Sequence, residues 1–354
     1  DKSFIRQSGA LVNVLANLEK QPFRLRVMGT AGSGKSLVVQ SFMEKEAEQG
    51  KRQLFLCFNR LLAEKRKAVW FNDHNDETVI QTFYGFCSEF LISHGLSLDY
   101  QKMAKESETF WQDVLEQVIS LDIDEAWMFD TLVIDEGQDF QDHWYEIAKL
   151  FLKENASILW LEDKEQKLVF GRSVKLDQFV SYRCNINYRS PEAIARFILN
   201  TLPIKFEIGN PLPGLGVDVH EYQNEQEQPK KVANIVQQLI RQGFTQDEIY
   251  IVSCKGVSKS GFSTLNKIGN LPLSHFTGSY DEEGQQIMTE GQLHFDSIYR
   301  FKGLESPAVI LVDIDFDKLN KHQQHVLFCG MTRATVKLDL LVNTEKRGSR
   351  ELFT

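Results

Sequence analysis

A glycine-rich segment near the start of the chain carries the clearest chemistry in the sequence. Residues 29–36 read GTAGSGKS, which satisfies the P-loop pattern of a glycine, four residues and then Gly-Lys-Ser. An apolar run precedes the segment and a helical pattern follows it, so backbone N–H groups and a helix N-terminus would converge on phosphate oxygens. We expect Lys35 to neutralise the terminal phosphates of ATP and Ser36 to hold Mg²⁺. The expected phosphate-loop contacts are Gly29, Gly32, Ser33, Gly34, Lys35 and Ser36.

Two adjacent carboxylates offer the second half of an ATPase site. Residues 130–140 read DTLVIDEGQDF, an apolar strand pattern that ends in Asp135 and Glu136. Asp135 can hold Mg²⁺ through the water shell of the ion, while Glu136 can orient and deprotonate the attacking water. Adjacent acids at a strand end are also common as plain surface, but the P-loop in the same chain favours the catalytic interpretation.

Two arginines in the second half of the chain could complete such a site. In the segment NYRSPEA, Ser190 is expected at a helix N-cap and Pro191 at the first helical position, which fixes Arg189 just outside the helix. The segment FCGMTRA places Arg333 close to a strand-like run. Either arginine alone is typical of an exposed surface. Together they could contact a γ-phosphate from a second domain, which would make domain closure depend on the nucleotide.

Alternating apolar runs and helical patterns must position these residues. The alternation in the first half indicates parallel βαβ units, and the second half repeats it more loosely. We therefore predict an α/β fold of two domains, each a mainly parallel sheet flanked by helices. The expected domains are residues 1–182 and 183–354, with a small helical insertion at about 88–127 in the first. Arg24 and Arg26 interrupt the apolar run before the P-loop, which suggests that this strand starts outside the sheet.

Composition limits the class of protein. A chain of 354 residues, 42% of them hydrophobic, is typical of a folded globular protein with two cores. The five cysteines lack metal-type spacing and no signal peptide or membrane-spanning run is visible, so we expect a cytoplasmic protein. The net charge of −9 points away from a protein that coats nucleic acid, although gripping a few nucleotides needs only a local basic lining. Because the sequence starts with Asp1 rather than Met, we expect an internal fragment of a longer chain.

The order and content of the motifs resemble UvrD/Rep-type superfamily one (1A) helicases over nearly the whole chain. The matching segments are GTAGSGKS, VIDEGQDF, NYRSPEA, FKGLE at residues 301–305 and MTRA at residues 331–334. The resemblance implies two RecA-like P-loop domains with an ATP cleft between them, in a compact core without large accessory domains. It also implies an ATP hydrolase that requires Mg²⁺ and acts on single-stranded DNA.

The resemblance assigns further nucleotide contacts, each carried over to the matching residue. Gln166, which follows Asp163 in LEDKEQ, matches the γ-phosphate sensor that links the two domains. Gly303 and Glu305 match the motif that touches the γ-phosphate and the ribose. Gln7 matches the glutamine that reads adenine, at a long distance from the P-loop.

The implied nucleic-acid contacts are aromatic and polar residues in several motifs. They are Phe58 and Asn59 in LCFNRLLA, Thr82 and Tyr84 in QTFYGF, Phe170 in KLVFG, and Tyr299 just before FKGLE. Tyr84 and Tyr299 each stand where the family has His, and KLVFG keeps only Phe170 near the place of the usual stacking residues, which weakens the case for base stacking. The basic run at residues 65–67 is interpreted as a solvated helix face rather than a nucleic-acid track. The five tryptophans are interpreted as core residues.

Three functions fit a P-loop chain of this kind. The first is an ATP-dependent single-stranded DNA translocase or helicase, with RNA as the other track that the motifs allow. The second is a nucleic-acid-stimulated ATPase switch or recruitment module that works with a nuclease or another protein partner, without processive unwinding. The third, a small-molecule P-loop kinase, does not explain NYRSPEA, FKGLE and MTRA in a second α/β domain. The motifs therefore favour the translocase.

Overall fold

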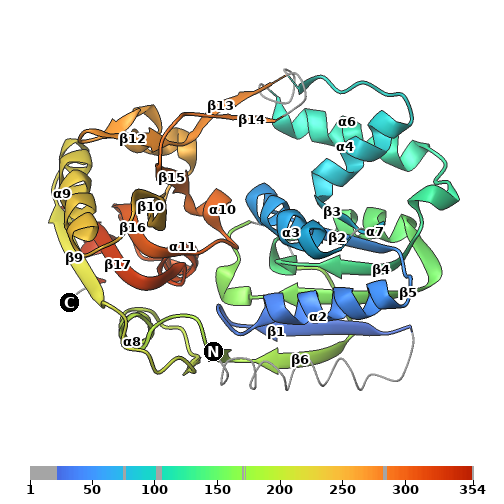
Figure 1. Cartoon of the computed structure of the whole chain (residues 1–354), viewed down its shortest axis with the longest axis horizontal. Helices are drawn as coiled ribbons and strands as arrows, with labels where there is room; N and C mark the ends of the chain where they lie inside the picture. Colours follow the sequence, from blue (N-terminus) through green and yellow to red (C-terminus); the bar gives the residue numbers. More distant parts are fainter. Residues whose placement is uncertain are drawn as a thin grey trace. The chain divides into compact units, whose positions relative to one another are not determined.

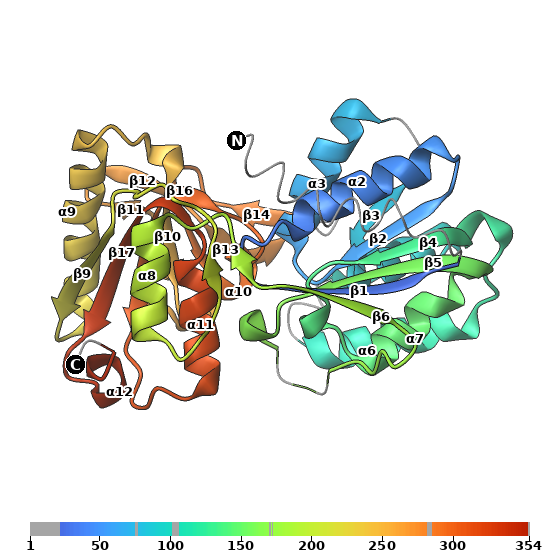
Figure 2. The same cartoon turned by 90° about the horizontal axis from the view of Figure 1, so that it is seen from below.

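The chain divides into two compact units, Asp1–Asn185 and Ile186–Thr354. The computed structural model describes residues 22–74, 77–100, 106–169, 171, 173–281 and 285–352. Each unit has its own sheet, in which most or all strand pairings are parallel, and its own helices (Figures 1 and 2). The prediction of an α/β fold with mainly parallel sheets flanked by helices is therefore confirmed, and such sheets are consistent with RecA-like domains.

Six parallel strands form the sheet of the first unit, in the order β3-β2-β4-β5-β1-β6. The strands are β1 (Arg24–Gly29), β2 (Gln53–Cys57), β3 (Val79–Thr82), β4 (Phe129–Ile134), β5 (Leu152–Glu162) and β6 (Val180–Cys184). Leu54, Phe55 and Leu56 of β2 are all fully buried, because both faces of a central parallel strand are covered by helices. The domain boundary expected after residue 182 falls inside β6, which pairs with β1 as far as Cys184.

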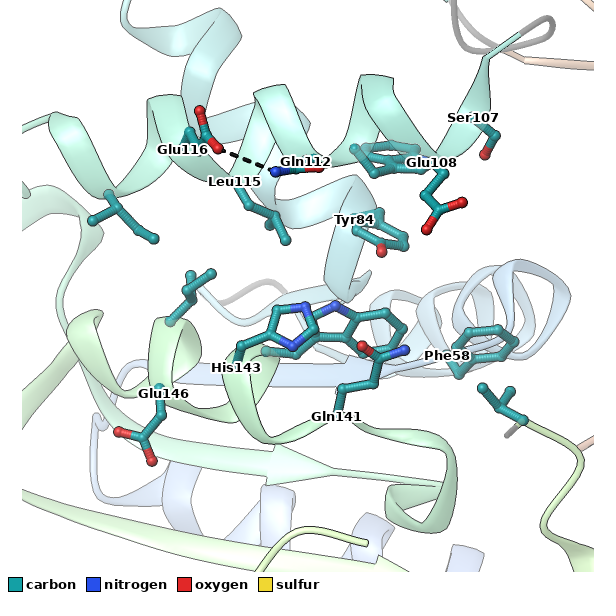
Figure 3. Close-up of a pocket in the computed structure, with 15 residues that line it drawn as sticks. Phe58, Tyr84, Ser107, Glu108, Gln112, Leu115, Glu116, Gln141, His143 and Glu146 are labelled. Atoms are coloured by element: carbon teal, nitrogen blue, oxygen red, sulfur yellow. Dashed lines mark hydrogen bonds between the residues drawn. The ribbon is translucent and has the colours of Figure 1, made fainter. Parts of the chain in front are cut away.

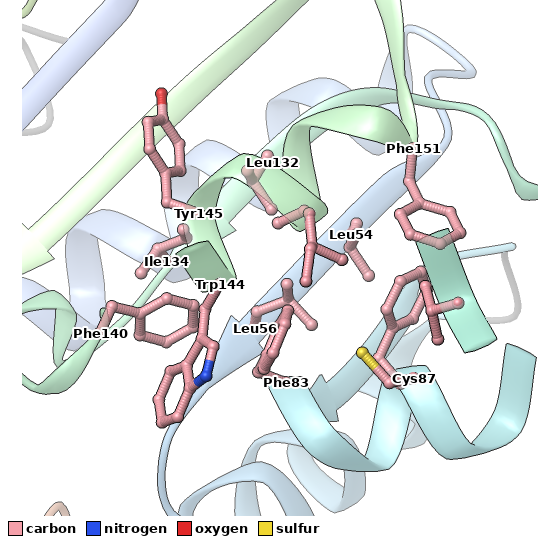
Figure 4. Packing of buried hydrophobic residues seen from close by; sticks show 14 of the residues in the cluster. Leu54, Leu56, Phe83, Cys87, Leu132, Ile134, Phe140, Trp144, Tyr145 and Phe151 are labelled. Atoms are coloured by element: carbon pink, nitrogen blue, oxygen red, sulfur yellow. The ribbon is translucent and has the colours of Figure 1, made fainter. Parts of the chain in front are cut away.

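Two groups of helices cover this sheet, one on each face (Figure 2). The helices are α2 (Lys35–Glu48), α3 (Arg60–Asp73), α4 (Phe83–Ser93), α6 (Ser107–Ser120) and α7 (Asp142–Leu150). On one face, Phe42 of α2 and Trp70 of α3 pack against the strands. On the other face, α4, α6 and α7 enclose an aromatic cluster that includes Phe83 and Trp144 (Figure 4). Because α6 contributes Phe110 to this cluster, the segment expected to be a helical insertion is part of the core.

Arg24 and Arg26 lie inside the sheet, since β1 pairs with β5 from Arg24 onward. The expectation that this strand starts outside the sheet is therefore wrong. Arg26 Nη2 donates to Glu162 Oε1 at 2.6 Å, and Trp160 Nε1 donates to the other oxygen of the same carboxylate at 3.1 Å. A carboxylate on the neighbouring strand, which the local sequence pattern does not reveal, thus compensates a cationic side chain in the sheet.

The tryptophans pack in the cores of the first unit. Trp70, Trp144 and Trp160 are buried, which confirms their interpretation as core residues. Trp111 and Trp127 are only partly buried, against the same cluster as Trp144. Trp111 also faces a surface cavity, described below, and therefore combines a packing role with an exposed edge.

Seven strands form the main sheet of the second unit, in the order β11-β12-β15-β10-β16-β17-β9. They are β9 (Val217–Tyr222), β10 (Ile249–Ser253), β11 (Lys267–Ile268), β12 (Leu271–Ser274), β15 (Leu293–Ser297), β16 (Ser306–Ile314) and β17 (Ala334–Asn343). All pairings are parallel except that of β11 with β12. Two further pairs stand apart, β7 (Ile186–Asn187) with β8 (Glu207–Ile208) and β13 (Phe276–Tyr280) with β14 (Gln286–Met288).

Helices cover both faces of this second sheet as well. They are α8 (Glu192–Thr201), α9 (Gln228–Arg241), α10 (Ile298–Phe301), α11 (Lys321–Met331) and α12 (Arg347–Arg350). Ile235 and Leu239 of α9 share a buried cluster with Ile310 of β16. Gly330 of α11 lies so close to Leu311 that an added Cβ would be 2.8 Å from that side chain, which puts α11 on the opposite face of β16. In the described part of the chain, no helix is both long and apolar enough to cross a membrane.

Candidate nucleotide and nucleic-acid sites

The expected phosphate loop forms a tight turn between β1 and α2. Gly32 and Gly34 have φ angles of 67° and 91°, a region that favours glycine, and α2 begins at Lys35. Lys35 Nζ donates to the carbonyl oxygens of Gly29 and Thr30 at 2.8 and 3.0 Å. The ammonium group therefore lies over the loop, at the N-terminal end of α2, where the helix dipole favours anions.

Ser33 gives an independent sign that the loop accommodates a polar ligand. Its hydroxyl is buried, and it finds no hydrogen-bond partner among the described residues. A Cβ placed on Gly29 would lie 2.3 Å from this hydroxyl, so the loop has no room for a side chain at that position. A buried hydroxyl without a partner costs free energy unless a ligand satisfies it. A phosphate oxygen would satisfy Ser33, and the loop therefore fits the group that the sequence predicts.

Asp135 and Glu136 follow directly after β4 and are both buried. Glu136 adopts a φ of 57°, which is unusual for a residue with a side chain and occurs disproportionately at functional sites. Gln138 Nε2 donates to Glu136 Oε2 at 2.6 Å, and Gln138 Oε1 accepts from the backbone N–H of Asp163 at 3.0 Å. Gln138 therefore ties the Glu136 carboxylate to the end of β5. Gln138 was not among the residues expected from sequence, although it stands two places after Glu136 in the acidic motif.

Trp160 of β5 packs against the turn at Gly137. A Cβ on Gly137 would lie 2.3 Å from Trp160 Nε1, so only glycine allows the turn to approach the ring. The indole itself is anchored, because its N–H donates to Glu162 at 3.1 Å. The position of Glu136 thus depends on packing against β5 as well as on the local chain.

The electrostatics around Asp135 favour a bound cation. Burial raises the pKa of Asp135, the neighbouring charge of Glu136 raises it further, and Arg66 and Lys35 act in the opposite direction. A hydroxyl from Ser36 and a carboxylate from Asp135 are hard oxygen donors of the kind that Mg²⁺ uses together with substrate phosphates. The donor chemistry therefore fits Mg²⁺. The described residues contain no group of three or more His, Cys, Asp or Glu side chains that could hold a metal ion.

The carboxyl ends of three strands bring these groups to one edge of the sheet. β5 lies between β4 and β1, so the acidic pair, the segment after β5 and the phosphate loop are neighbours at that edge. Asp163 and Gln166 follow β5 and are both buried. Ligands of open α/β sheets bind outside the carboxyl ends of the strands. The structure therefore brings together all the predicted nucleotide contacts of the first unit except Gln7, which lies outside the described residues.

In the second unit, Arg189 and Glu305 meet. Arg189 Nε lies 2.7 Å from Glu305 Oε2, and both side chains are partly exposed. The backbone of Arg189 is fixed, because Asn187 Oδ1 accepts from its N–H at 2.9 Å. The expected Ser190 N-cap is wrong: α8 begins at Glu192 with Pro191 at the cap, and Ser190 Oγ accepts from Asn187 Nδ2 at 3.0 Å. An asparagine that binds two backbone N–H groups, rather than the serine, shapes this turn.

Arg333 is far more enclosed than Arg189. It is 2% exposed, and its guanidinium donates to the carbonyl oxygens of Cys329 at 3.0 Å and Leu304 at 3.2 Å. The second contact reaches the FKGLE segment, where Gly303 has a φ of 85°. Arg333 therefore supports the backbone next to Glu305, and its side chain would have to leave these carbonyls to reach a ligand.

The expected nucleic-acid residues separate into three groups. Phe58 and Tyr84 line one cavity of about 860 Å³ in the first unit (Figure 3). Asn59 and Thr82 instead cap helices: Asn59 Oδ1 accepts from Leu61 N at 2.9 Å, and Thr82 Oγ1 accepts from Gly85 N at 3.0 Å. Tyr299 lies in the second unit with its hydroxyl 3.1 Å from His322 Nε2. Phe170 lies outside the described residues.

Aromatic rings and three glutamates line the cavity. It lies between α6 and the start of α7, and Figure 3 shows Tyr84 between the two helices. Phe58 stacks on Trp144 with ring centroids 6.0 Å apart, and Tyr84 stacks on Trp111 at 4.1 Å. Burial raises the pKa of Tyr84 to about 12, so the phenol stays neutral. The charged side chains on the described lining are Glu108, Glu116 and Glu146. This chemistry suits an uncharged ring better than a phosphate group.

A comparison with protein families finds a match in the second unit. Residues 292–341 match the UvrD-like helicase C-terminal domain. The matched segment runs from β15 into β17 and includes Tyr299, Gly303, Glu305 and Arg333. Among curated proteins, none matches the chain. The match supports a relation to UvrD/Rep-type proteins at a coarse level and suggests a helicase-related, nucleic-acid-dependent ATPase, a class of protein that generally uses ATP and Mg²⁺.

Proposed function

We propose that the chain is an ATP-dependent translocase or helicase that acts on single-stranded DNA. The observation that carries the proposal is the meeting of the phosphate loop, Asp135, Glu136 and Gln166 at one edge of a parallel sheet. The same chain contains a segment that matches a helicase C-terminal domain. An ATP site and a helicase segment in one chain are best explained by a motor whose ATP cycle is coupled to nucleic acid.

Hydrolysis in this proposal uses the groups of the first unit. Loop N–H groups and Lys35 bind the phosphates, while Ser36 and Asp135 hold Mg²⁺, which when bound neutralises charge on the phosphate oxygens. Glu136 accepts a proton from water as the water oxygen bonds to the γ-phosphorus and the bond to the bridging oxygen of ADP breaks. Gln138 keeps the Glu136 carboxylate in place for this transfer.

The second unit supplies the arginines in this proposal, with ATP in a cleft between the two units. Arg189 is the better candidate for direct phosphate contact, because its side chain is partly exposed and a phosphate oxygen can replace the partly exposed Glu305 carboxylate that it contacts. Arg333 has to give up backbone carbonyls, so its first role is to hold the segment that carries Gly303 and Glu305. Gln166 is proposed to sense the γ-phosphate, and Gln7 to read adenine.

Nucleic acid is proposed to cross the first unit at Phe58, with bases rather than phosphates facing the aromatic cavity. Tyr84, Phe170 and Tyr299 are proposed as further contacts, and Asn59 and Thr82 would act through the backbone turns that they cap. The five cysteines are free thiols, which fits work in the reducing cytoplasm.

A switch or recruitment module that works with a nuclease or other protein partner is the second candidate. The three glutamates that line the cavity favour it, because a continuous track for phosphates should be basic. A streptavidin-displacement assay separates the two functions. A translocase should displace streptavidin from one end of a biotinylated single strand in an ATP-dependent way. ATPase stimulated by the strand without displacement from either end would favour the switch.

A further inference from the structure

Arg66 lies next to the proposed cation site, although it belongs to neither the phosphate loop nor the acidic motif. It sits on α3, where Lys65 and Lys67 on either side are exposed, while the side chain of Arg66 is only 10% exposed. Its Nη2 lies 3.7 Å from Asp135 Oδ2, and its Nη1 donates to the backbone carbonyl of Ser36 at 3.4 Å. The guanidinium therefore reaches both residues proposed to hold Mg²⁺. The interpretation of residues 65–67 as a solvated helix face is wrong for Arg66.

The contacts of Arg66 are loose enough to be exchanged. The 3.7 Å separation from Asp135 is an ion pair rather than a short hydrogen bond. The guanidinium also lies over the ring of Phe55, with its carbon 5.6 Å from the ring centroid. This cation–π contact holds the side chain against strand β2 of the sheet. A long arginine stem anchored in this way can withdraw from a carboxylate without unfolding its helix.

A counter-charge is needed at this position when no nucleotide is present. Asp135 and Glu136 are adjacent and buried, and two ionised carboxylates so close together repel each other. Lys35 is occupied with the carbonyl oxygens of the phosphate loop. In the described part of the chain, Arg66 forms an ion pair with Oδ2 of Asp135 at 3.7 Å. Removing it would leave the two carboxylates facing each other with less compensation.

We propose that Arg66 is a built-in counter-ion, which occupies the cation side of Asp135 in the nucleotide-free protein and gives way when Mg²⁺ arrives with the nucleotide. The displacement of Arg66 by Mg²⁺ rests on the proposed ATPase function, whereas the compensation of Asp135 by Arg66 does not. Arg66 would compete with the ion for the Asp135 carboxylate, because two cations on one carboxylate repel each other. Arg66 is thus a positioning residue that keeps the metal ligand in place and sets how strongly nucleotide binding depends on Mg²⁺.

The first test measures thermal unfolding of the nucleotide-free protein in EDTA and does not depend on ATPase activity. Arg66→Ala should lower the melting temperature, whereas in the Asp135→Asn background the same substitution should have little effect, because the charge that it compensates is gone. Lys65→Ala and Lys67→Ala are matched controls that remove a cation from the same helix without reaching Asp135. Additive effects of Arg66→Ala and Asp135→Asn would overturn the proposal. If Arg66→Ala does not fold, Arg66→Met, which keeps most of the apolar stem, replaces it in the comparison of single and double variants.

The second test compares the affinity for a fluorescent ADP analogue in Mg²⁺ and in EDTA. The ratio of the affinity in Mg²⁺ to the affinity in EDTA should rise about fivefold in Arg66→Ala, because Mg²⁺ no longer competes with the guanidinium for Asp135. An unchanged or smaller ratio would contradict the displacement step. Failure of the parent protein to bind the nucleotide at all would instead contradict the proposed ATPase function. The melting temperatures of the single and double variants would still decide whether Arg66 compensates Asp135.

Discussion

Gln138 offers the sharpest test of how the acidic motif works, because its amide connects Glu136, which follows β4, to Asp163, which follows β5. Gln138→Ala removes the 2.6 Å hydrogen bond to Glu136 and leaves the buried N–H of Asp163 without the acceptor that it has at 3.0 Å. An unsatisfied buried donor costs about 1–3 kcal/mol, so we expect a loss of stability in that range. A positioned general base contributes about 10²–10⁴-fold to a rate, and a Glu136 that is present but less fixed should lose part of that, about tenfold to a hundredfold in kcat.

Single-turnover ATP hydrolysis and binding of a non-hydrolysable analogue measure the two effects separately. Nucleotide affinity should change little, because the Gln138 amide makes its hydrogen bonds with Glu136 and Asp163 rather than with the phosphate loop. Gln40→Ala is the matched control, since Gln40 Nε2 donates to Glu44 Oε1 at 2.8 Å on α2, outside the acidic motif. A kcat equal to that of the parent in Gln138→Ala would refute the positioning of Glu136 by Gln138.

Three further predictions follow from the same geometry. Lys35→Ala should abolish nucleotide binding and hydrolysis, whereas Glu136→Gln should keep ATP binding and lose turnover; parent-rate hydrolysis by Glu136→Gln in a single-turnover experiment would mean that another group activates the water. Arg189→Ala should lower kcat by about a thousandfold while affinity for a non-hydrolysable analogue stays nearly unchanged, and a parallel loss of affinity would indicate a ground-state contact instead. Phe58→Ala should weaken binding of a single strand about tenfold in a fluorescence-anisotropy titration, whereas Phe71→Ala, which removes a similarly exposed ring from α3, should not; equal effects would remove Phe58 from the strand path.

The phosphate loop and the acidic pair could be predicted from sequence because each depends on one strand and the residues that directly follow it. Glycines at positive φ and carboxylates at a strand end leave signals within a few residues. The parallel sheets were predictable for the same reason, since a buried central strand such as β2 contains a continuous apolar run, here at residues 54–57.

The partners of these residues could not be predicted, because they come from strand order. Gln138 reaches Asp163 because β5 lies beside β4. Arg26 is tolerated in the sheet because Glu162 lies on the neighbouring strand. Arg66 looked like one cation in a basic run, and nothing in its neighbours shows that the middle side chain turns inward toward Asp135.

Asn59 and Thr82 show the opposite case, in which a local signal was available. Each residue directly precedes a helix, and Asn and Thr are favoured N-cap residues. The capping role accounts for both side chains without a ligand. Phe58, the neighbour of Asn59, has no such local role and remains the better candidate for contact with a strand.

We propose above that ATP hydrolysis by this chain is coupled to single-stranded nucleic acid. The most direct measurement is the steady-state rate of ATP hydrolysis by the parent protein and by Lys35→Ala, with and without a single-stranded DNA oligonucleotide in the presence of Mg²⁺. We expect a low basal rate that the strand raises strongly in the parent, and no hydrolysis with or without the strand in Lys35→Ala. Hydrolysis that no single strand of DNA or RNA stimulates would rule out the coupling, and hydrolysis that survives in Lys35→Ala would rule out the proposed phosphate site.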